Sequence, residues 1–204
     1  MDYLDTLERE IHTVIASTVD KDNLPVTTAI DIMDHDEGGV YFLTAKGKGF
    51  YSRLKANPFI ALTGVKGQNT LSSLAISLRG KVRECDRERL ETLLKKNPYM
   101  YEIYPSEESR SSLVALCLYQ GVGEYFDLSK KPIERVSFAI GEEETPKEGY
   151  EITSACIGCK ACRKACPQNC IDFTKIPPYI EQEHCLRCGN CVALCPVNAI
   201  IKRG

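Results

Sequence analysis

The chain has 204 residues, of which 43% are hydrophobic, enough for one large domain or for a medium domain with a small one. Its formal net charge is only -2 at pH 7, which gives no indication of a nucleic-acid partner. The acidic N-terminus lacks the basic start and apolar run of a signal peptide, and no later apolar run could span a bilayer. We therefore expect a cytoplasmic protein that is not bound to a membrane.

The first 140 residues have the pattern of an α+β domain, in which short apolar segments alternate with turns and helices. The predicted elements in chain order are an opening helix with Leu4, Leu7 and Ile11 on one face, strands at 14–19, 25–33 and 40–44, a helix at 48–57, strands at 59–65 and 72–85, helices at 86–96 and 107–113, and strands at 114–126 and 133–140. Strands that follow one another so closely through turns favour an antiparallel sheet or barrel.

Cysteines divide the chain into two parts. Nine of the eleven lie between Cys156 and Cys195, and an odd total without an export signal argues against a disulfide framework. Dense free thiols usually bind metal. The charged segment that contains Pro146 and Gly149 precedes them and is typical of a solvated linker. We therefore expect a first domain at 1–140, a linker at 141–150 and a metal-binding domain at 151–204.

The cysteines form the motif C-x2-C-x2-C-x3-C-P twice, once from Cys156 to Pro167 and once from Cys185 to Pro196. Three cysteines at this spacing wrap three corners of a 4Fe–4S cubane, and the fourth begins a short helix that points toward the other copy. The predicted ligands of one cluster are Cys156, Cys159, Cys162 and Cys195, and those of the other are Cys185, Cys188, Cys191 and Cys166. Zinc is the alternative, but its sites use paired knuckles separated by a longer stretch.

The remaining cysteines and the histidines have plainer interpretations. Cys170 corresponds to Ala199 in the other copy of the repeat, so we expect a core residue there and leave a ligand or redox thiol as the alternative. Cys85 and Cys117 lie in predicted strands and are expected in the core. The three histidines, His12, His35 and His184, are scattered, and each is expected to be solvated or to serve in packing.

The cysteine-rich tail resembles the bacterial two-cluster ferredoxins over both copies of the motif. This resemblance implies low-potential transfer of single electrons. It also implies that Ile157 and Leu186, which follow the first cysteine of each copy, shield the clusters from water.

A strand, a basic glycine-containing loop and a helix occupy residues 40–58. Thr44, Lys46 and Lys48 lie at or before the expected helix start, where a hydroxyl and two ammonium groups can bind a phosphate. A solvated basic turn is the alternative interpretation, and the bare chemistry favours it.

Residues 1–140 also resemble the pyridoxamine 5′-phosphate oxidase-like split-barrel flavoproteins, through the segments at 24–31, 40–48 and 57–62. The resemblance implies a six-stranded antiparallel split β-barrel with flanking helices, a homodimer, and FMN near the subunit interface. Its phosphate would be held by Thr44, Lys46 and Lys48, and the isoalloxazine would pass the strand of Val26, Thr27, Thr28 and Ala29.

Three positions depart from that family. Gly49 and Phe50 stand where the oxidases carry an Arg-Lys pair, and Ala75 stands where they carry a Gln, which argues against vitamin-B6 oxidation. The segment 125–136 resembles split-barrel proteins with a fused ferredoxin tail. That segment has two interpretations. It is either a final strand and turn, or it has a role in the FMN site or the subunit interface.

These features predict an iron–sulfur flavoprotein oxidoreductase, in which two 4Fe–4S clusters relay single electrons to or from FMN and FMN reduces or oxidises a small organic substrate. Its expected partners are a second copy, a redox protein such as a ferredoxin, or the small substrate. A non-catalytic electron-transfer protein is one alternative, and a redox sensor whose barrel binds haem or a deazaflavin is another.

Overall fold

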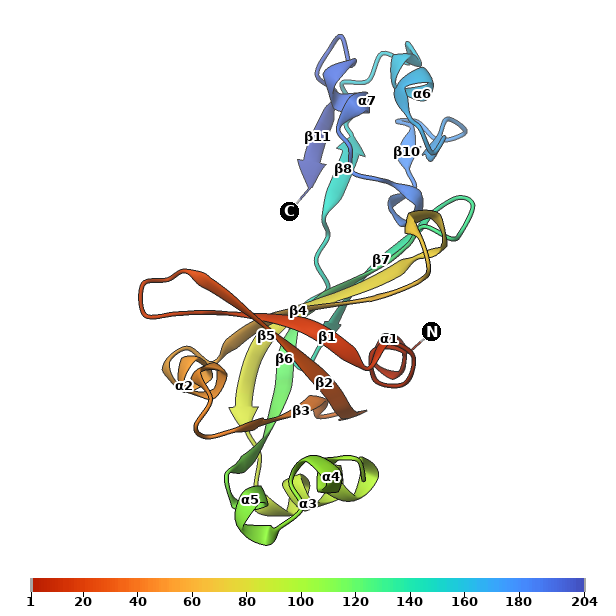
Figure 1. Cartoon of the computed structure of the whole chain (residues 1–204). Coiled ribbons are helices and arrows are strands. Elements are labelled where there is room, and N and C mark those ends of the chain that lie inside the picture. Colours follow the sequence, from red (N-terminus) through yellow and green to blue (C-terminus); the bar gives the residue numbers. More distant parts are fainter. Residues whose placement is uncertain (1, 204) are drawn as a thin grey trace.

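Seven antiparallel strands form the main sheet in a computed structural model that describes residues 2–203 (Figure 1). The strands are β1 (Thr13–Val19), β2 (Pro25–Asp36), β3 (Gly39–Ala45), β4 (Phe59–Lys66), β5 (Leu74–Glu84), β6 (Leu113–Asp127) and β7 (Glu134–Ile140). Their order is β3-β2-β1-β4-β5-β6-β7, and β3 also pairs with β6. This last pairing closes β1 to β6 into a barrel, which confirms the predicted six-stranded antiparallel fold.

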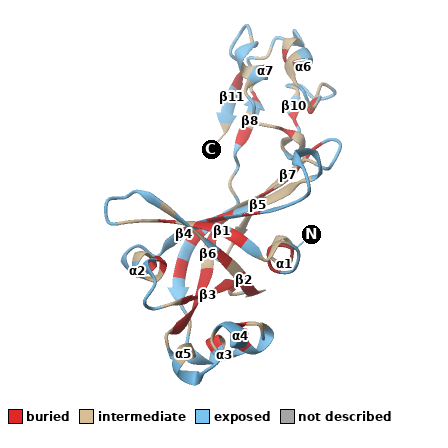
Figure 2. Cartoon of the chain, viewed as in Figure 1, coloured by how far each residue is buried: buried red, intermediate tan, exposed pale blue. Residues whose placement is uncertain are grey.

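Alternating side chains along the strands fill the barrel, because successive residues of a strand point to opposite faces. Ile60 and Leu62 of β4 and Ile76 and Leu78 of β5 are buried, while the residues between them face outward. Figure 2 shows the buried positions gathered in the barrel strands and the helices that cover them. Where β5 and β6 cross closely, a Cβ at Gly80 would lie 2.0 Å from the Gln120 carbonyl oxygen, so only glycine fits.

Short helices cover the open ends of the barrel. They are α1 (Tyr3–Asp5), the π-helix η1 (Thr6–Ile11), α2 (Gly49–Ala56), the 3-10 turn η2 (Thr70–Ser72), α3 (Arg87–Lys96), α4 (Met100–Ile103) and α5 (Glu107–Ser111). Asp86 caps α3 as predicted, and Leu90, Leu93 and Leu94 pack in a second core that includes Cys117. α4 was not predicted, and β2 continues to Asp36 through residues expected to form a turn.

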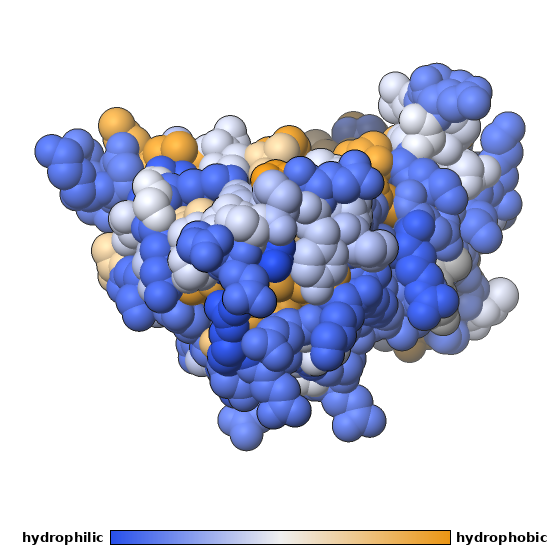
Figure 3. Space-filling model, turned by 60° about the horizontal axis from the view of Figure 1, so that its bottom comes forward, coloured by the Kyte–Doolittle hydropathy of each residue, from blue (hydrophilic) through white to orange (hydrophobic). Residues whose placement is uncertain are grey.

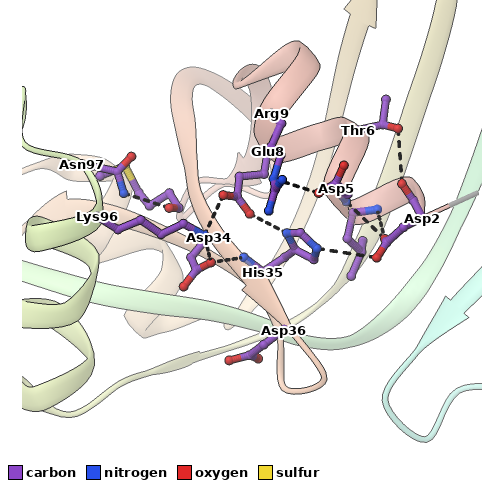
Figure 4. Close-up of polar contacts among 12 residues, drawn as sticks. Asp2, Asp5, Thr6, Glu8, Arg9, Asp34, His35, Asp36, Lys96 and Asn97 are labelled. Atoms are coloured by element: carbon purple, nitrogen blue, oxygen red, sulfur yellow. Dashed lines mark hydrogen bonds and ion pairs between the residues drawn. The ribbon is translucent and has the colours of Figure 1, made fainter.

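A partly buried polar network joins the N-terminal helix to β2 and α3 (Figure 4). Glu8 Oε1 lies 2.7 Å from Lys96 Nζ, and Glu8 Oε2 lies 2.5 Å from His35 Nδ1. Lys96 also contacts Asp34. His35 was expected to be solvated or a packing residue, but the structure makes it a polar link between η1 and β2. No local sequence pattern indicates this link, because η1 and β2 are distant in the sequence and come together only when the barrel folds.

We expect Glu8→Gln to lower the free energy of unfolding at pH 7 by about 1–3 kcal/mol, because Glu8 is buried and accepts from Lys96 and His35. Burial raises the pKa of Glu8, but the hydrogen bonds from Lys96 and His35 bring it below its usual value. This stabilisation is therefore present above the ordinary Glu pKa of about 4.3 and is lost as the pH falls through the lower folded value.

Denaturant unfolding at pH 7 and at lower pH measures this effect. Glu10→Gln is the matched control, since Glu10 is exposed and pairs with Lys66 at 2.7 Å. We expect less than about 1 kcal/mol for that exposed pair. Equal losses in the two variants, or a Glu8→Gln deficit that grows toward acidic pH, would contradict the network's role.

A smaller unit follows the barrel and stands at one end of it (Figure 1). Its elements are β8 (Gly149–Ile152), α6 (Ala161–Ala165), β9 (Ile171–Asp172), β10 (Tyr179–Ile180), the 3-10 turn η3 (Gln182–His184), α7 (Asn190–Ala193) and β11 (Ile200–Arg203). β8 pairs with β11 and β9 with β10, so the two halves are tied together by antiparallel ladders. β8 begins at Gly149, inside the segment expected as linker. In the described part of the chain, no helix combines the length and apolar character needed to cross a bilayer.

Candidate functional site

The eight cysteines of the repeat surround two cavities in the small unit. One cavity is lined by the thiols of Cys156, Cys159, Cys162 and Cys195. The other is lined by those of Cys166, Cys185, Cys188 and Cys191, and Cys170 lines it as well. The structure therefore brings together the two crossed sets that the repeat predicts, with the fourth cysteine of each copy beside the other copy's loop. Their ligation itself stays a prediction.

The donor set of each cavity fits a cubane. Among residues 2–203, no three Cys, His, Asp or Glu side chains converge closely enough to chelate a single metal ion. Each set of four thiols instead surrounds a space, as a cluster with ligands at four separate corners requires. Apolar side chains, among them Ile152 and Ile200 around one cavity and Ile171 and Ile180 around the other, complete the walls. Such walls limit water access and so influence a cluster's potential.

Backbone groups in the ligand loops point at sulfur. The Arg187 N–H donates to Cys185 Sγ at 3.3 Å, and the Ala199 N–H donates to Cys195 Sγ at 3.2 Å. A hydrogen bond from the Cys170 thiol lowers the pKa of Cys185, and the Arg187 N–H adds to that effect against the opposing effect of burial. Cys170 is buried, as expected, and its Sγ lies 3.5 Å from Cys166 Sγ.

A second candidate site is a pocket of about 220 Å³ in the barrel domain, between β2, β3, α2 and α4. Four residues of the predicted FMN site line it: Thr28, Ala29, Thr44 and Lys48. The other three predicted residues, Val26, Thr27 and Lys46, do not. No side chain caps α2 at Lys48, so its first turn leaves N–H groups for a ligand. Figure 3, turned to bring forward the end with α3 to α5, shows mostly hydrophilic side chains with hydrophobic atoms in hollows between them.

Asp31 places a carboxylate in the wall of this pocket, a residue that was not predicted. Thr13 Oγ1 donates to Asp31 Oδ1 at 2.7 Å, and Tyr99 OH donates to Asp31 Oδ2 at 3.1 Å. His12 Nε2 lies 3.6 Å from the same carboxylate oxygen, and its backbone has the uncommon φ of 64°. Burial and the negative charge of Asp31 raise the pKa of Tyr99, so its hydroxyl stays a donor. The sequence signal that could have identified Asp31 is its pairing with Thr13, which follows once the register of β1 and β2 is known.

The two units meet through a small group of polar side chains. Arg187 Nη1 donates to Glu124 Oε2 of β6 at 2.7 Å and to Glu148 Oε2 at 2.8 Å. His184 Nδ1 lies 2.8 Å from the Ile133 carbonyl oxygen, a contact that the sequence did not indicate. A pocket of about 300 Å³ lies beside this contact, between residues of β4 to β7 and the linker. Arg187, inside a cysteine loop, is therefore also a barrel contact.

Two family models match the chain. Residues 2–118, just over half of the chain, match the family described as pyridoxamine 5′-phosphate oxidase, and residues 155–199 match the 4Fe-4S dicluster domain. These matches confirm both resemblances predicted from the sequence.

Two curated relatives match the small unit. A 45-residue stretch is 53% identical to one component of the ion-translocating oxidoreductase complex of Methanosarcina acetivorans, and it covers 22% of this chain and 17% of that component. A 53-residue stretch is 45% identical to a protein named ferredoxin 7Fe from Hydrogenibacillus schlegelii, and it covers 25% of this chain and 68% of that protein. The chain thus spans only a small part of the first of these relatives.

Solved structures match the barrel. A NimC/NimA family protein from Clostridium acetobutylicum has a TM-score of 0.55 at 19% identity, over 68% of this chain and 94% of that one. A protein of the pyridoxinephosphate oxidase family from the same organism has a TM-score of 0.52 at 22% identity, over 67% and 91%. A heme binding protein from Mycobacterium smegmatis has a TM-score of 0.51 at 12% identity, over 66% and 56%. At these identities the likeness shows the fold alone.

Proposed function

Because the chain belongs to the pyridoxamine 5′-phosphate oxidase family and carries a ferredoxin-like 4Fe–4S electron-transfer domain, we propose that it is an iron–sulfur flavoprotein oxidoreductase. The observation that carries this proposal is one chain with two cavities that each bring four cysteines of the repeat together, and a barrel pocket lined by Thr28, Thr44 and Lys48. When bound, FMN would interconvert the single electrons of the clusters and the two-electron chemistry of a small organic substrate.

The barrel pocket suits one end of FMN. At about 220 Å³ it is smaller than the roughly 300 Å³ at which ligand pockets usually begin. We therefore place the phosphate end there, with the Lys48 ammonium, the Thr44 hydroxyl and the N–H groups at the start of α2 as donors. This assignment leaves out Lys46, because the Lys46 side chain does not line the pocket.

Asp31 places a carboxylate in the wall of the same pocket. Thr13 and Tyr99 donate hydrogen bonds to its two oxygens, and His12 Nε2 lies 3.6 Å from Oδ2. Its negative charge would repel a phosphate placed beside it, so the phosphate would lie toward Lys48 and the start of α2. The protein would thus position the cofactor, while electrons arrive through the small unit.

The proposal includes a homodimer. Large apolar side chains are exposed on neighbouring strands, Ile15 of β1 at 54%, and Phe59 and Val65 of β4 at 46% and 61%. A second copy that covers this face would also shelter the part of FMN that the pocket does not hold. Light scattering on the purified protein should give twice the 22.8 kDa of one chain. A mass of one chain at micromolar concentration would contradict the dimer.

Anaerobic purification followed by cofactor extraction tests the proposed function. We expect brown protein with about eight iron and eight sulfide per chain, and acid-released FMN near one per chain. Extracts with haem or a deazaflavin in place of FMN would favour the sensor alternative. An extract free of any such cofactor would overturn the flavoprotein proposal. Reduction of quinone or nitro acceptors by the holoprotein then separates an enzyme from a simple carrier.

A further inference from the structure

The two copies of the cysteine repeat are not equivalent in the folded chain. Within residues 2–203, each hydrogen bond or ion pair that joins the small unit to the barrel and linker involves Gln168, His184 or Arg187. His184 and Arg187 flank Cys185, and Gln168 follows the crossed ligand Cys166. Gln168 lines the second cavity, and the other two residues lie next to its predicted ligand Cys185, so this cavity faces the barrel.

Each copy of the repeat has one residue other than glycine at positive φ, Lys160 (61°) in the first copy and Arg187 (55°) in the second, and the other copy has glycine at the equivalent position. Gly158 and Arg187 occupy the same position in their copies of the repeat, and both have positive φ, 70° for Gly158 and 55° for Arg187. Glycine adopts this region freely, whereas a residue with a Cβ does so at a cost. The second copy nevertheless has an arginine there, and its guanidinium reaches Glu124 and Glu148. The asymmetry lies in what the side chains reach, because Arg187 contacts the barrel and the linker, whereas Lys160 is exposed.

The cavity of Cys156 is surrounded by exposed side chains and not by contacts with the barrel. Ile157, which follows Cys156, is 65% exposed, whereas the equivalent Leu186 in the second copy is half-buried. Leu194 and Val197, on either side of the crossed ligand Cys195, are 58% and 38% exposed. Exposed apolar side chains around one cavity form the centre of a surface that no part of the described chain covers.

Positively charged residues surround this surface. Residues 153–170 contain Lys160, Arg163 and Lys164, all exposed, and no Asp or Glu. From Gly149 onward the chain has seven Lys and Arg against four Asp and Glu, a net +3, while the rest of the chain has a net -5. An apolar centre with a basic rim is the usual form of a surface that docks an acidic partner.

We propose that the cluster of Cys156, Cys159, Cys162 and Cys195 is the outer one, and that the surface of Ile157, Leu194 and Val197 with its basic rim docks a small acidic ferredoxin. When both clusters are bound, one electron would pass from the reduced ferredoxin, which is thereby oxidised, to the outer cluster. The same electron would then pass to the inner cluster of Cys185, which would return the outer cluster to its oxidised state. This inference rests on the proposed function and adds to it the order of the clusters and the kind of partner.

Charge reversal on the rim tests the docking surface. The holoprotein variant Lys160→Glu/Lys164→Glu leaves Arg163 over the Phe173 ring. Stopped-flow absorbance would follow cluster reduction by an acidic bacterial ferredoxin that has been reduced beforehand. We expect the bimolecular rate to fall about tenfold or more at low salt and the difference to shrink at high salt. Lys21→Glu/Lys95→Glu is the control, with the same change of net charge on exposed barrel residues.

The outcomes separate this inference from the proposed function. Excess dithionite should reduce the same amount of cluster in the wild-type protein and in both variants, which shows that the clusters assemble. Equal rates for the rim variant and the control, or rates insensitive to salt, would overturn the docking surface. Protein without clusters in the wild-type form would instead refute the proposed function.

Discussion

Replacing Cys195 by alanine should remove the cluster of the other repeat copy. Cys195 shares its copy with Cys185 and Cys188, yet its thiol lines the cavity of Cys156. Loss of one ligand from a small unit that relies on its metal centres should release that cluster, so iron should fall from about eight to about four per chain.

Pairs of substitutions distinguish crossed from uncrossed ligation. With crossed ligands, Cys156→Ala/Cys195→Ala removes two ligands of the same cluster. It should therefore retain about four iron per chain, as each single variant does. Cys185→Ala/Cys195→Ala removes one ligand from each cluster and should retain almost no iron. Uncrossed ligation would give the reverse result.

Cys170→Ala is the matched control for these variants. Its thiol is buried 3.5 Å from Cys166 Sγ, and the equivalent position in the other copy is Ala199. Alanine therefore has a precedent in the same fold, and the variant should keep about eight iron. Loss of iron from Cys170→Ala would make this thiol a ligand and would change the assignment of the second cluster.

The cysteine sets could be predicted because their spacing is a local property of the chain. Three ligands within one short loop must converge, whatever the rest of the protein does, and the fourth can reach only the other copy. The barrel could be predicted for a related reason, since alternation along Ile60 and Leu62 or Ile76 and Leu78 shows which face of a strand is buried. The start of β2 at Pro25 and the cap at Asp86 are likewise local signals.

The barrel pocket could be predicted only in part, because its walls come from distant segments. Thr44 and Lys48 flank one loop and could be found together, whereas Met100 and Ile103 belong to α4, a helix too short to show a period. Asp31 becomes a pocket residue only when β1 and β2 pair and Tyr99 folds over them. The role of Arg187 also needed the fold, because its sequence neighbours indicate a cluster and not a barrel contact.

Lys48→Ala should weaken FMN binding by about tenfold or more, while Lys46→Ala should change it by less than about twofold. The difference follows from geometry, since both lysines lie in one loop and Lys48 alone of the two lines the pocket. A charge-assisted hydrogen bond to phosphate contributes about 1.5–3 kcal/mol, and each 1.4 kcal/mol is about a factor of ten in Kd.

Fluorescence titration of flavin-free protein with FMN measures the affinity of both variants, and riboflavin, which has no phosphate, is the matched ligand. Lys48→Ala should leave riboflavin affinity nearly unchanged. A loss confined to Lys46→Ala would move the phosphate to the exposed side of the loop, and equal losses of FMN and riboflavin affinity in Lys48→Ala would mean that Lys48 supports the pocket without binding the phosphate.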